Sequence, residues 1–177
     1  MNRLLIVVDM QNDFVYGSLG SEAAQAIVPN VMRKAYQYSF DEVIFTRDTH
    51  FPTYFETLEG QKLPIEHCIV DTKGWEIIDE LKSFSEYPDV KIINKYTFGY
   101  NNWKNLEGVL ATREIDEIEI VGLCSDICIV SNALILKAQF PNVKITVDAS
   151  CCAGTTPEAH AAALTVMKSC QIDVIGE

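Results

Sequence analysis

The stretch Val121-Gly-Leu-Cys-Ser-Asp-Ile-Cys128 decides how this chain is organised, because a strand pattern ends in it and a helix pattern follows it. Residues 117–121 are alternating and rich in β-branched side chains, which is typical of a strand. Residues 129–138 form a longer apolar segment of helical character. The sequence therefore predicts a strand, a tight turn and a helix, with Cys128 in the first turn of that helix.

Two interpretations of Cys128 follow from this position. The first turn of a helix carries free N–H groups and a partial positive charge, which favour a thiolate over a thiol. Such an environment suits a nucleophile beside an anion-stabilising pocket. A free cysteine is, however, usually a small buried hydrophobic residue, so the turn alone leaves both interpretations open.

Strand and helix patterns alternate outward from this turn in both directions. Apolar runs that end in a charged residue predict strands buried on both faces, as in a parallel sheet. Amphipathic segments between these runs predict helices. The predicted strands cover residues 3–9, 41–48, 90–95, 117–121, 143–148 and 171–175, and the predicted helices start at Ser21 or Pro29 and cover 75–82, 105–113, 129–138 and 155–169.

This sixfold alternation predicts an α/β fold built from right-handed βαβ crossovers. We expect three layers, with helices on both faces of a mostly parallel six-stranded sheet, in a Rossmann-like arrangement. The 177 residues contain no internal repeat and no linker, so a single domain is expected. In such folds, ligands bind beyond the carboxyl ends of the strands.

Composition excludes several classes of protein. Hydrophobic residues make up 48% of the chain, which fits a packed domain rather than a disordered one. The net charge is −11 and no basic stripe is present, which argues against nucleic-acid binding. No signal peptide and no apolar run long enough to cross a membrane are found. We therefore expect a soluble cytoplasmic protein.

The six cysteines are expected to be free thiols. They include no Cys-x-x-Cys pair and no regular framework, and cytosolic chains keep their thiols reduced. Cys170 is expected in the core. No chemical role is assigned to the adjacent Cys151 and Cys152.

Asp9, Asp48, Lys95 and Cys128 each stand at or just past the end of a predicted strand. Attack on a carbonyl carbon requires a thiolate, and Asp9 offers a carboxylate that accepts the thiol proton while Lys95 holds both charges in place. Backbone N–H groups at Cys124 and Cys128 would stabilise the developing oxyanion. This set predicts acyl transfer through a thioester. The alternative is three unrelated strand-end residues, two of which form an ordinary ion pair.

A second group of functional residues lies around the irregular segment 49–73, and a loop of that length is usually functional. Asp48-Thr-His50 stands at the start of this segment, and His67 follows within it. One carboxylate and two imidazoles fit a mixed nitrogen and oxygen metal site. The alternative is a pair of surface-loop histidines. The third histidine, His160, is expected to be exposed.

Three motifs together resemble a known family. Leu5-Ile-Val-Val-Asp9-Met-Gln-Asn-Asp13-Phe14 resembles the opening of the isochorismatase-like cysteine hydrolases, which include nicotinamidases. Lys95-Tyr-Thr-Phe98 resembles their lysine motif, and Gly122-Leu-Cys-Ser-Asp-Ile-Cys128 resembles their Gly-x-x-Thr/Ser-Asp-x-Cys motif. The motifs occur in the family's order and the resemblance covers nearly the whole chain. Residues 1–177 are therefore expected to form one isochorismatase-like hydrolase domain.

The resemblance implies a catalytic triad of Asp9, Lys95 and Cys128 that hydrolyses a carboxamide such as nicotinamide to the acid and ammonia. It also implies a cis peptide bond between Leu123 and Cys124, which turns amide groups toward the oxyanion. Cys124 stands where the family often has alanine, and its side chain is expected to be structural.

The resemblance further implies a divalent metal ion beside the triad, bound in nicotinamidases by an Asp-x-His pair and a later histidine. Asp48, His50 and His67 match these ligands. The family's intermediate histidine would fall at Glu56, whereas some relatives use a glutamate nearer Glu59, and Glu59 is the preferred fourth ligand. Zinc is the expected ion, although a carboxylate also suits manganese, iron or magnesium.

Phe14, Phe98 and Tyr100 are expected to wall the substrate ring, although aromatic side chains at strand ends more often belong to the core. A small carboxamide is therefore the expected partner of the site. By analogy with relatives, we expect a homo-oligomer.

Three other functions are compatible with the predicted fold. A relative with the same triad acts on isochorismate, a carbamoyl amide or a ureidoacrylate, and the metal cluster favours a nicotinamidase over an isochorismatase. A non-catalytic binding protein is a second alternative, which the intact triad argues against. A thiol redox protein is a third, which the lack of a Cys-x-x-Cys pair argues against.

Overall fold

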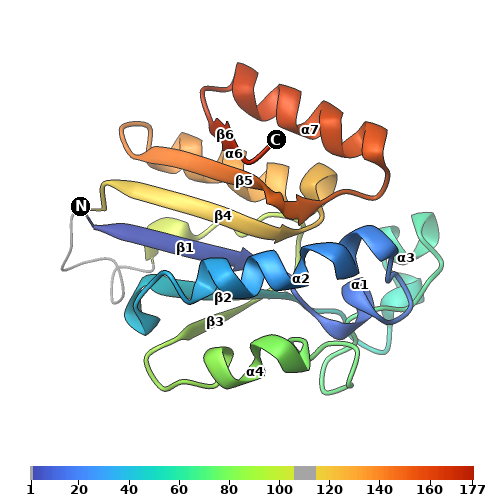
Figure 1. The fold of residues 1–177 in the computed structure, drawn as a ribbon. Helices are drawn as coiled ribbons and strands as arrows, with labels where there is room; N and C mark the ends of the chain where they lie inside the picture. Colours follow the sequence, from blue (N-terminus) through green and yellow to red (C-terminus); the bar gives the residue numbers. More distant parts are fainter. Residues whose placement is uncertain (1, 106–114) are drawn as a thin grey trace.

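A computed structural model, which describes residues 2–105 and 115–177, contains one sheet of six strands (Figure 1). The strands lie in the order β3-β2-β1-β4-β5-β6, and each neighbouring pair is parallel. The predicted α/β sheet is thus confirmed, and its strands all run in one direction. The strands are β1 (Arg3–Val8), β2 (Val43–Asp48), β3 (Lys91–Lys95), β4 (Glu117–Leu123), β5 (Lys144–Ala153) and β6 (Asp173–Ile175).

Helices cover both faces of this sheet and complete the predicted three layers. In Figure 1, α2 and α4 lie in front of the sheet and α6 lies behind it, while α1 and α3 lie beyond the tips of the strand arrows. The helices are α1 (Asn12–Val15), α2 (Glu22–Ala35), α3 (Leu58–Lys62), α4 (Asp79–Ser85), α6 (Val130–Gln139) and α7 (Pro157–Ser169). Single turns are η1 (Phe40–Glu42), η2 (Tyr54–Glu56), η3 (Trp103–Asn105) and the π-helical η4 (Ser125–Ile129).

The core has two halves, one on each face of the sheet. Leu4, Ile6 and Val8 of β1 pack with α6 and α7, whereas Leu5 and Val7 pack with α2 and α4. Successive side chains of a strand point to opposite faces. Because both faces are covered by helices, both sets must be apolar, and this explains the unbroken apolar runs in the sequence.

The order of strands reverses between β1 and β4, and this reversal positions the site. The chain leaves β1 toward α2 on one face and leaves β4 toward α6 on the other, which opens a crevice beyond the carboxyl ends of these two strands. Gly122 of β4 has a φ of +116°, and a Cβ there would lie 2.1 Å from the carbonyl oxygen of Val8. Only glycine therefore allows the ends of β1 and β4 to approach this closely.

Of two predicted helix starts, the one at Ser21 is confirmed and the one at residue 75 is wrong. Helix α2 starts at Glu22, where the Ser21 hydroxyl accepts the Ala24 N–H, and Pro29 lies inside the helix rather than at its start. The helix predicted over residues 75–82 instead begins at Asp79, because the preceding residues pair with the segment after β1: Ile77 bridges Gln11 and the Ile78 N–H donates to Met10. The helix predicted over residues 105–113 lies outside the described residues, apart from Asn105.

The six cysteines are free thiols, as predicted, but the predicted location of one of them is wrong. Cys170 is exposed rather than in the core, because α7 ends at Ser169 and Cys170 forms its C-cap. The other five cysteines are buried or half-buried.

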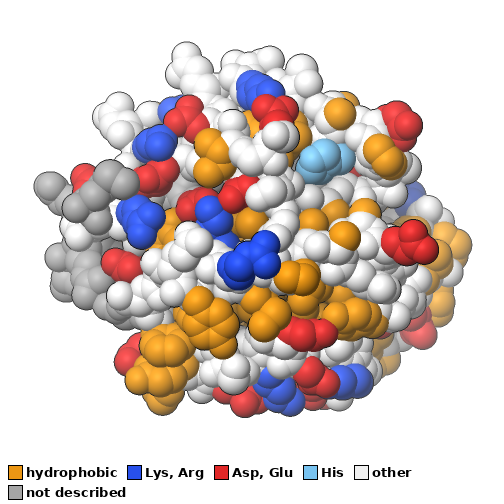
Figure 2. All heavy atoms as spheres, in the orientation of Figure 1, with side chains coloured by type: hydrophobic (Ala, Val, Ile, Leu, Met, Phe, Trp, Pro, Cys, Tyr) orange, Lys and Arg blue, Asp and Glu red, His pale blue; other side chains and the backbone are white. Residues whose placement is uncertain are grey.

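The surface seen in Figure 2 carries acidic and basic side chains in mixed order, and hydrophobic side chains gather on it between α2 and α4. Within the described residues, the helices are too short or too polar to cross a membrane.

Candidate active site and metal centre

The turn that carries Cys128 is the π-helical η4, which joins the end of β4 to α6. The carbonyl of Cys124 accepts the N–H groups of Ile127 and Ile129, and these bonds define the tight turn. The peptide bond between Leu123 and Cys124 is cis, as expected. Cys128 is almost fully buried, yet it lines a cavity, so its thiol is reachable only from that cavity.

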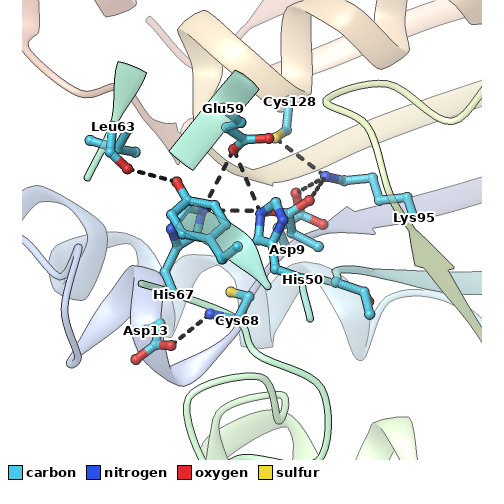
Figure 3. Close-up of polar contacts among 12 residues, drawn as sticks. Asp9, Asp13, His50, Glu59, Leu63, His67, Cys68, Lys95 and Cys128 are labelled. Atoms are coloured by element: carbon cyan, nitrogen blue, oxygen red, sulfur yellow. Dashed lines mark hydrogen bonds and ion pairs between the residues drawn. The ribbon is translucent and has the colours of Figure 1, made fainter. Parts of the chain in front are cut away.

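Lys95 is the last residue of β3, and its side chain contacts residues at the ends of the neighbouring strands β2 and β1 (Figure 3). Its ammonium nitrogen lies 2.8 Å from Asp9 Oδ2 and 3.0 Å from Asp48 Oδ1, and it donates a 3.4 Å hydrogen bond to the Cys128 sulfur. The hydroxyl of Thr46 donates to Asp9 Oδ1 at 2.7 Å. The structure therefore brings the three predicted triad residues into one buried cluster.

Burial determines the protonation of this cluster. It raises the pKa of the Cys128 thiol well above the usual value, and the nearby Lys95 ammonium only partly opposes this. Burial also raises the pKa of Asp9 against the opposing effect of Lys95. For Lys95, burial would lower the pKa, but Asp9 and the other acidic groups around it raise it instead. Burial thus opposes the thiolate that the first turn of a helix favours, and the raised pKa of Asp9 makes its carboxylate a better proton acceptor.

A second cluster adjoins the first through Asp48. Ligand atoms of Asp48, His50, Glu59 and His67 all lie within 4.8 Å of one another. His50 Nε2 is 2.9 Å from Asp48 Oδ2 and 3.6 Å from Glu59 Oε1, and His67 Nε2 is 3.7 and 3.8 Å from the same two oxygens. Four tetrahedral ligands at about 2 Å from a zinc ion lie roughly 3.3 Å apart. The spacing of the cluster therefore fits a single small cation.

The ring orientation of His67 also fits metal binding. Its Nδ1 atom lies 2.9 Å from the Ile65 carbonyl oxygen, which can only accept a hydrogen bond. A neutral imidazole that donates from Nδ1 to this carbonyl presents the lone pair of Nε2 to the cluster. Figure 3 shows His50, His67 and Glu59 converging on one point.

The two glutamates considered as a fourth ligand differ in position. Glu59 lies on α3, whose first turn is capped by the Thr57 hydroxyl, and its carboxylate reaches the histidines. Glu56 lies in η2 and is exposed to solvent. Among the described residues, the cluster that fits a metal ion contains Glu59 and does not contain Glu56.

A cavity of about 830 Å³ opens beside Cys128 and the metal-site cluster. Two of the three predicted wall residues, Phe14 and Phe98, line this cavity. Tyr100 does not belong to the described lining, because its ring packs edge-on against the buried Trp103 instead. The assignment of Tyr100 to the substrate wall stays a prediction, which this packing does not favour.

Gln11 supports the metal-site cluster and was not identified from the sequence. Its fully buried amide accepts the N–H of Asp48 at 2.7 Å and donates to the carbonyl of Asp48 at 2.9 Å. It also donates to the carbonyl of Trp75. Gln11 thus fixes the backbone of Asp48. In the sequence, only its place inside the motif of residues 5–14 could have indicated that Gln11 has a role at the site.

Asn132 was missed as well. It is fully buried on α6, one turn after Cys128, and its amide donates to the carbonyl groups of Cys128 and Phe98 at 2.8 and 3.3 Å. Its side-chain oxygen accepts the N–H of Tyr100 at 2.8 Å. Asn132 therefore ties the loop that carries Phe98 to the turn that carries Cys128.

Helix α7 holds the same turn from its other side. His160 Nδ1 lies 2.7 Å from the Ser125 hydroxyl, and the Asp126 carboxylate accepts the N–H of Thr155 at 2.9 Å. His160 is consequently half-buried and not exposed as expected, because it is packed against η4. Ser125 and Asp126 therefore shape the turn through these contacts.

Comparisons with known proteins agree with this geometry. The isochorismatase domain family matches residues 3–176. The nicotinamidase of Schizosaccharomyces pombe is 29% identical over 207 residues, which cover 98% of this chain and 92% of that protein. A probable inactive nicotinamidase of Arabidopsis thaliana is 31% identical over 180 residues, which cover 95% and 89%. The structure of a pyrazinamidase from Pyrococcus horikoshii in complex with zinc superposes with a TM-score of 0.80 at 25% identity and full coverage of both chains.

Proposed function

Because this chain belongs to the isochorismatase family, we propose that it is an amidohydrolase of the nicotinamidase type, which cleaves the C–N bond of nicotinamide or a closely related carboxamide. The observation that carries the proposal is the position of Lys95, whose ammonium group contacts Asp9, Asp48 and Cys128 at once. A triad and a metal-site cluster that share one lysine and open on one cavity match the chemistry of amide hydrolysis. The nicotinamidases among the relatives support the same substrate class.

The proposed reaction begins with transfer of the thiol proton of Cys128 to Asp9, while the sulfur attacks the carbonyl carbon. Lys95 stays protonated throughout and balances the negative charge of Asp9 whenever Asp9 is ionised. Backbone N–H groups of Cys124 and Cys128 are the proposed donors to the oxyanion of the tetrahedral intermediate. Asp9 then passes its proton to the leaving nitrogen, so that ammonia departs and a thioester remains. Water attacks the thioester with Asp9 as base, which releases the acid and restores the thiol.

Asp48, His50, Glu59 and His67 are the residues proposed to hold a divalent ion, with zinc as the first choice. Such an ion would bind the ring nitrogen of a pyridine carboxamide and polarise nearby water. The pairing of two imidazoles with two carboxylates also suits manganese or iron. The His67 tautomer described above supports this assignment.

A catalytically silent protein is the second candidate, because one relative of similar identity is described as probably inactive. The buried contacts between Asp9, Lys95 and Cys128 favour catalysis over this alternative, since an unused buried charge cluster costs stability. A family hydrolase that acts on isochorismate, a carbamoyl amide or a ureidoacrylate shares the triad, and the metal-site cluster favours the pyridine carboxamide. The single-domain organisation, cytoplasmic location and homo-oligomeric state stay predictions.

Ammonia release tests the proposal. The wild-type protein should release ammonia from nicotinamide at a higher kcat/KM than from carbamoyl or ureido substrates. The Cys128→Ala variant should release none, whereas Cys170→Ala, which removes an exposed thiol away from the cavity, should match the wild type. Circular dichroism spectra of both variants check folding. Full activity of Cys128→Ala would refute the mechanism, and an inactive wild type whose Cys128 resists iodoacetamide would favour the silent protein.

A further inference from the structure

The cavity beside Cys128 is larger than an unsubstituted pyridine carboxamide requires. Its volume is about 830 Å³. Cavities of roughly 300–1,000 Å³ bury drug-sized molecules, whereas nicotinamide is one small ring with a single amide group. Much of the cavity thus lies beyond any ring that places its amide carbon at the Cys128 sulfur.

Three large apolar side chains line this outer part, and we name them the apolar rim: Leu58 of α3, and Tyr96 and Phe98 of the loop after β3. Their exposed fractions are 68%, 61% and 47%. Large apolar side chains that are exposed and also line a cavity mark a binding surface. The apolar rim is continuous with the reacting centre, because Cys128 lines the same cavity.

The apolar rim is held in place by its surroundings. The ring of Tyr96 stacks on Phe51, with centroids 5.8 Å apart and planes inclined by 10°. The carbonyl of Phe98 accepts a hydrogen bond from Asn132. Leu58 stands in the first turn of α3, directly after its cap Thr57. The Tyr96 ring and the backbone at Phe98 and Leu58 are thus ordered before binding, which lowers the conformational entropy lost when a ligand arrives.

The charges around the cavity restrict what the apolar rim would bind. Within the described lining, Lys62 is the single lysine or arginine. Phosphate and carboxylate groups are recognised by clusters of arginine and lysine. An uncharged occupant therefore suits this cavity better than an anionic one.

We propose that the apolar rim binds an uncharged aryl or alkyl substituent of the carboxamide, so that the preferred substrate class is an aromatic carboxamide with an apolar extension. This inference rests on the proposed amidohydrolase activity and narrows its substrate. The reacting amide stays at Cys128 while the extension lies along Leu58, Tyr96 and Phe98.

The test compares ammonia release from nicotinamide, 5-phenylnicotinamide and 6-phenylnicotinamide. The better phenyl compound should exceed nicotinamide in kcat/KM by about tenfold, which is the scale of discrimination by apolar pockets. Its 4-carboxyphenyl analogue, which has the same shape and a negative charge, should fall below it. A kcat/KM for both phenyl compounds no higher than that of nicotinamide would overturn the inference and leave the proposed function intact.

A pair of variants locates the effect. Leu58→Asp should lower kcat/KM for the better phenyl compound by a larger factor than for nicotinamide. Val166→Asp introduces the same charge at an exposed apolar position of α7 outside the cavity lining, and should leave the ratio of the two substrates unchanged. Equal losses for both substrates in Leu58→Asp would overturn the inference.

Two further measurements keep the inference separate from its rivals. If no amide releases ammonia, the proposed function fails, and calorimetric binding of the phenyl compound then decides the role of the apolar rim. Weaker binding by Leu58→Asp than by Val166→Asp supports a ligand surface, and equal binding overturns it. Loss of an oligomer in Leu58→Asp on sedimentation, without any phenyl preference, would assign the apolar rim to contact between copies and also overturn it.

Discussion

The ammonium nitrogen of Lys95 lies 2.8 Å from the Asp9 carboxylate, and both side chains are completely shielded from solvent. Lys95 also contacts Asp48, a member of the metal-site cluster, at 3.0 Å. Lys95 thus lies between Asp9, the proposed acceptor of the Cys128 proton, and Asp48, a proposed metal ligand. A change at Lys95 should therefore affect stability as well as activity.

Replacing Lys95 by methionine should lower the free energy of unfolding by about 3–5 kcal/mol, because Asp9 and Asp48 would be left as buried charges without their partner. Urea denaturation at neutral pH measures this loss. Lys73→Met removes a lysine whose ion pairs are exposed, and should leave the free energy of unfolding nearly unchanged. Similar small losses in both variants would show that the buried charges are compensated in another way.

Glu59 and Glu56 provide a matched test of the metal-site cluster. Glu59→Gln removes a carboxylate that faces His50 and His67, and should weaken binding of zinc by at least about tenfold, the lower end of what outer-shell substitutions cost. Glu56→Gln alters an exposed side chain and should have no effect. Plasma emission spectroscopy after dialysis against limiting zinc gives the metal content. The double variant of His50 and His67 to alanine should contain almost none, and an unchanged content there would exclude this site.

Asn132→Ala should separate substrate binding from the chemical step. The variant leaves the carbonyl of Cys128 and the N–H of Tyr100 without their partner, which should cost about 1–3 kcal/mol of stability. It also frees the loop that carries Phe98, so that KM for nicotinamide should rise by a larger factor than kcat falls. Gln139→Ala, which removes an exposed amide bridge from α6 to Asn101 and Lys104, is the control and should leave KM unchanged.

The protonation of Asp148 should make the free energy of unfolding depend on pH in the acidic range. Burial alone would raise its pKa, but hydrogen bonds from Ser150 and Lys34 outweigh burial and hold the pKa below the usual 3.8. A lowered pKa in the folded state stabilises the protein fully above the unfolded pKa, and this gain is lost as the pH falls through the folded pKa.

The stabilisation lost in Asp148→Asn should therefore be constant above about pH 5 and shrink below pH 3.8. Urea denaturation of wild type and variant between neutral pH and about pH 3 follows this difference. Asp173→Asn, whose pair with Lys144 is largely exposed, should show a much smaller difference at every pH. A difference for Asp148→Asn that stays constant to the lowest pH would contradict the expectation.

The sheet, and the edge of it at which the candidate site lies, could be predicted from the sequence. Buried parallel strands read as unbroken apolar runs, and ligands in such folds gather beyond their carboxyl ends. Asp9, Asp48, Lys95 and Cys128 could therefore be grouped before any coordinates were known, and the contacts of Lys95 confirm that they meet. Their chemical roles stay predictions.

The missed features depend on contacts between distant segments. Gln11 acts on Asp48, and Ser125 meets His160 across the gap between η4 and α7, and no local pattern records either contact. The place of Tyr100 likewise depends on packing, because its partly buried ring packs edge-on against the buried Trp103 and not along the described cavity. Helix α4 starts late because tertiary pairing of Ile77 with Gln11 outweighs local helical spacing.

The reversal of strand order between β1 and β4 also governs how the site assembles. Strands β1, β2 and β3 are neighbours both along the chain and in the sheet, so Asp9, Asp48 and Lys95 can meet without the second half of the chain. Cys128 joins them only when β4 pairs with the open edge of β1, a contact between residues more than a hundred positions apart. The thiol is therefore the one member of the cluster that depends on a contact between the two halves of the chain, and reactivity at Cys128 reports that the central strand pair has closed.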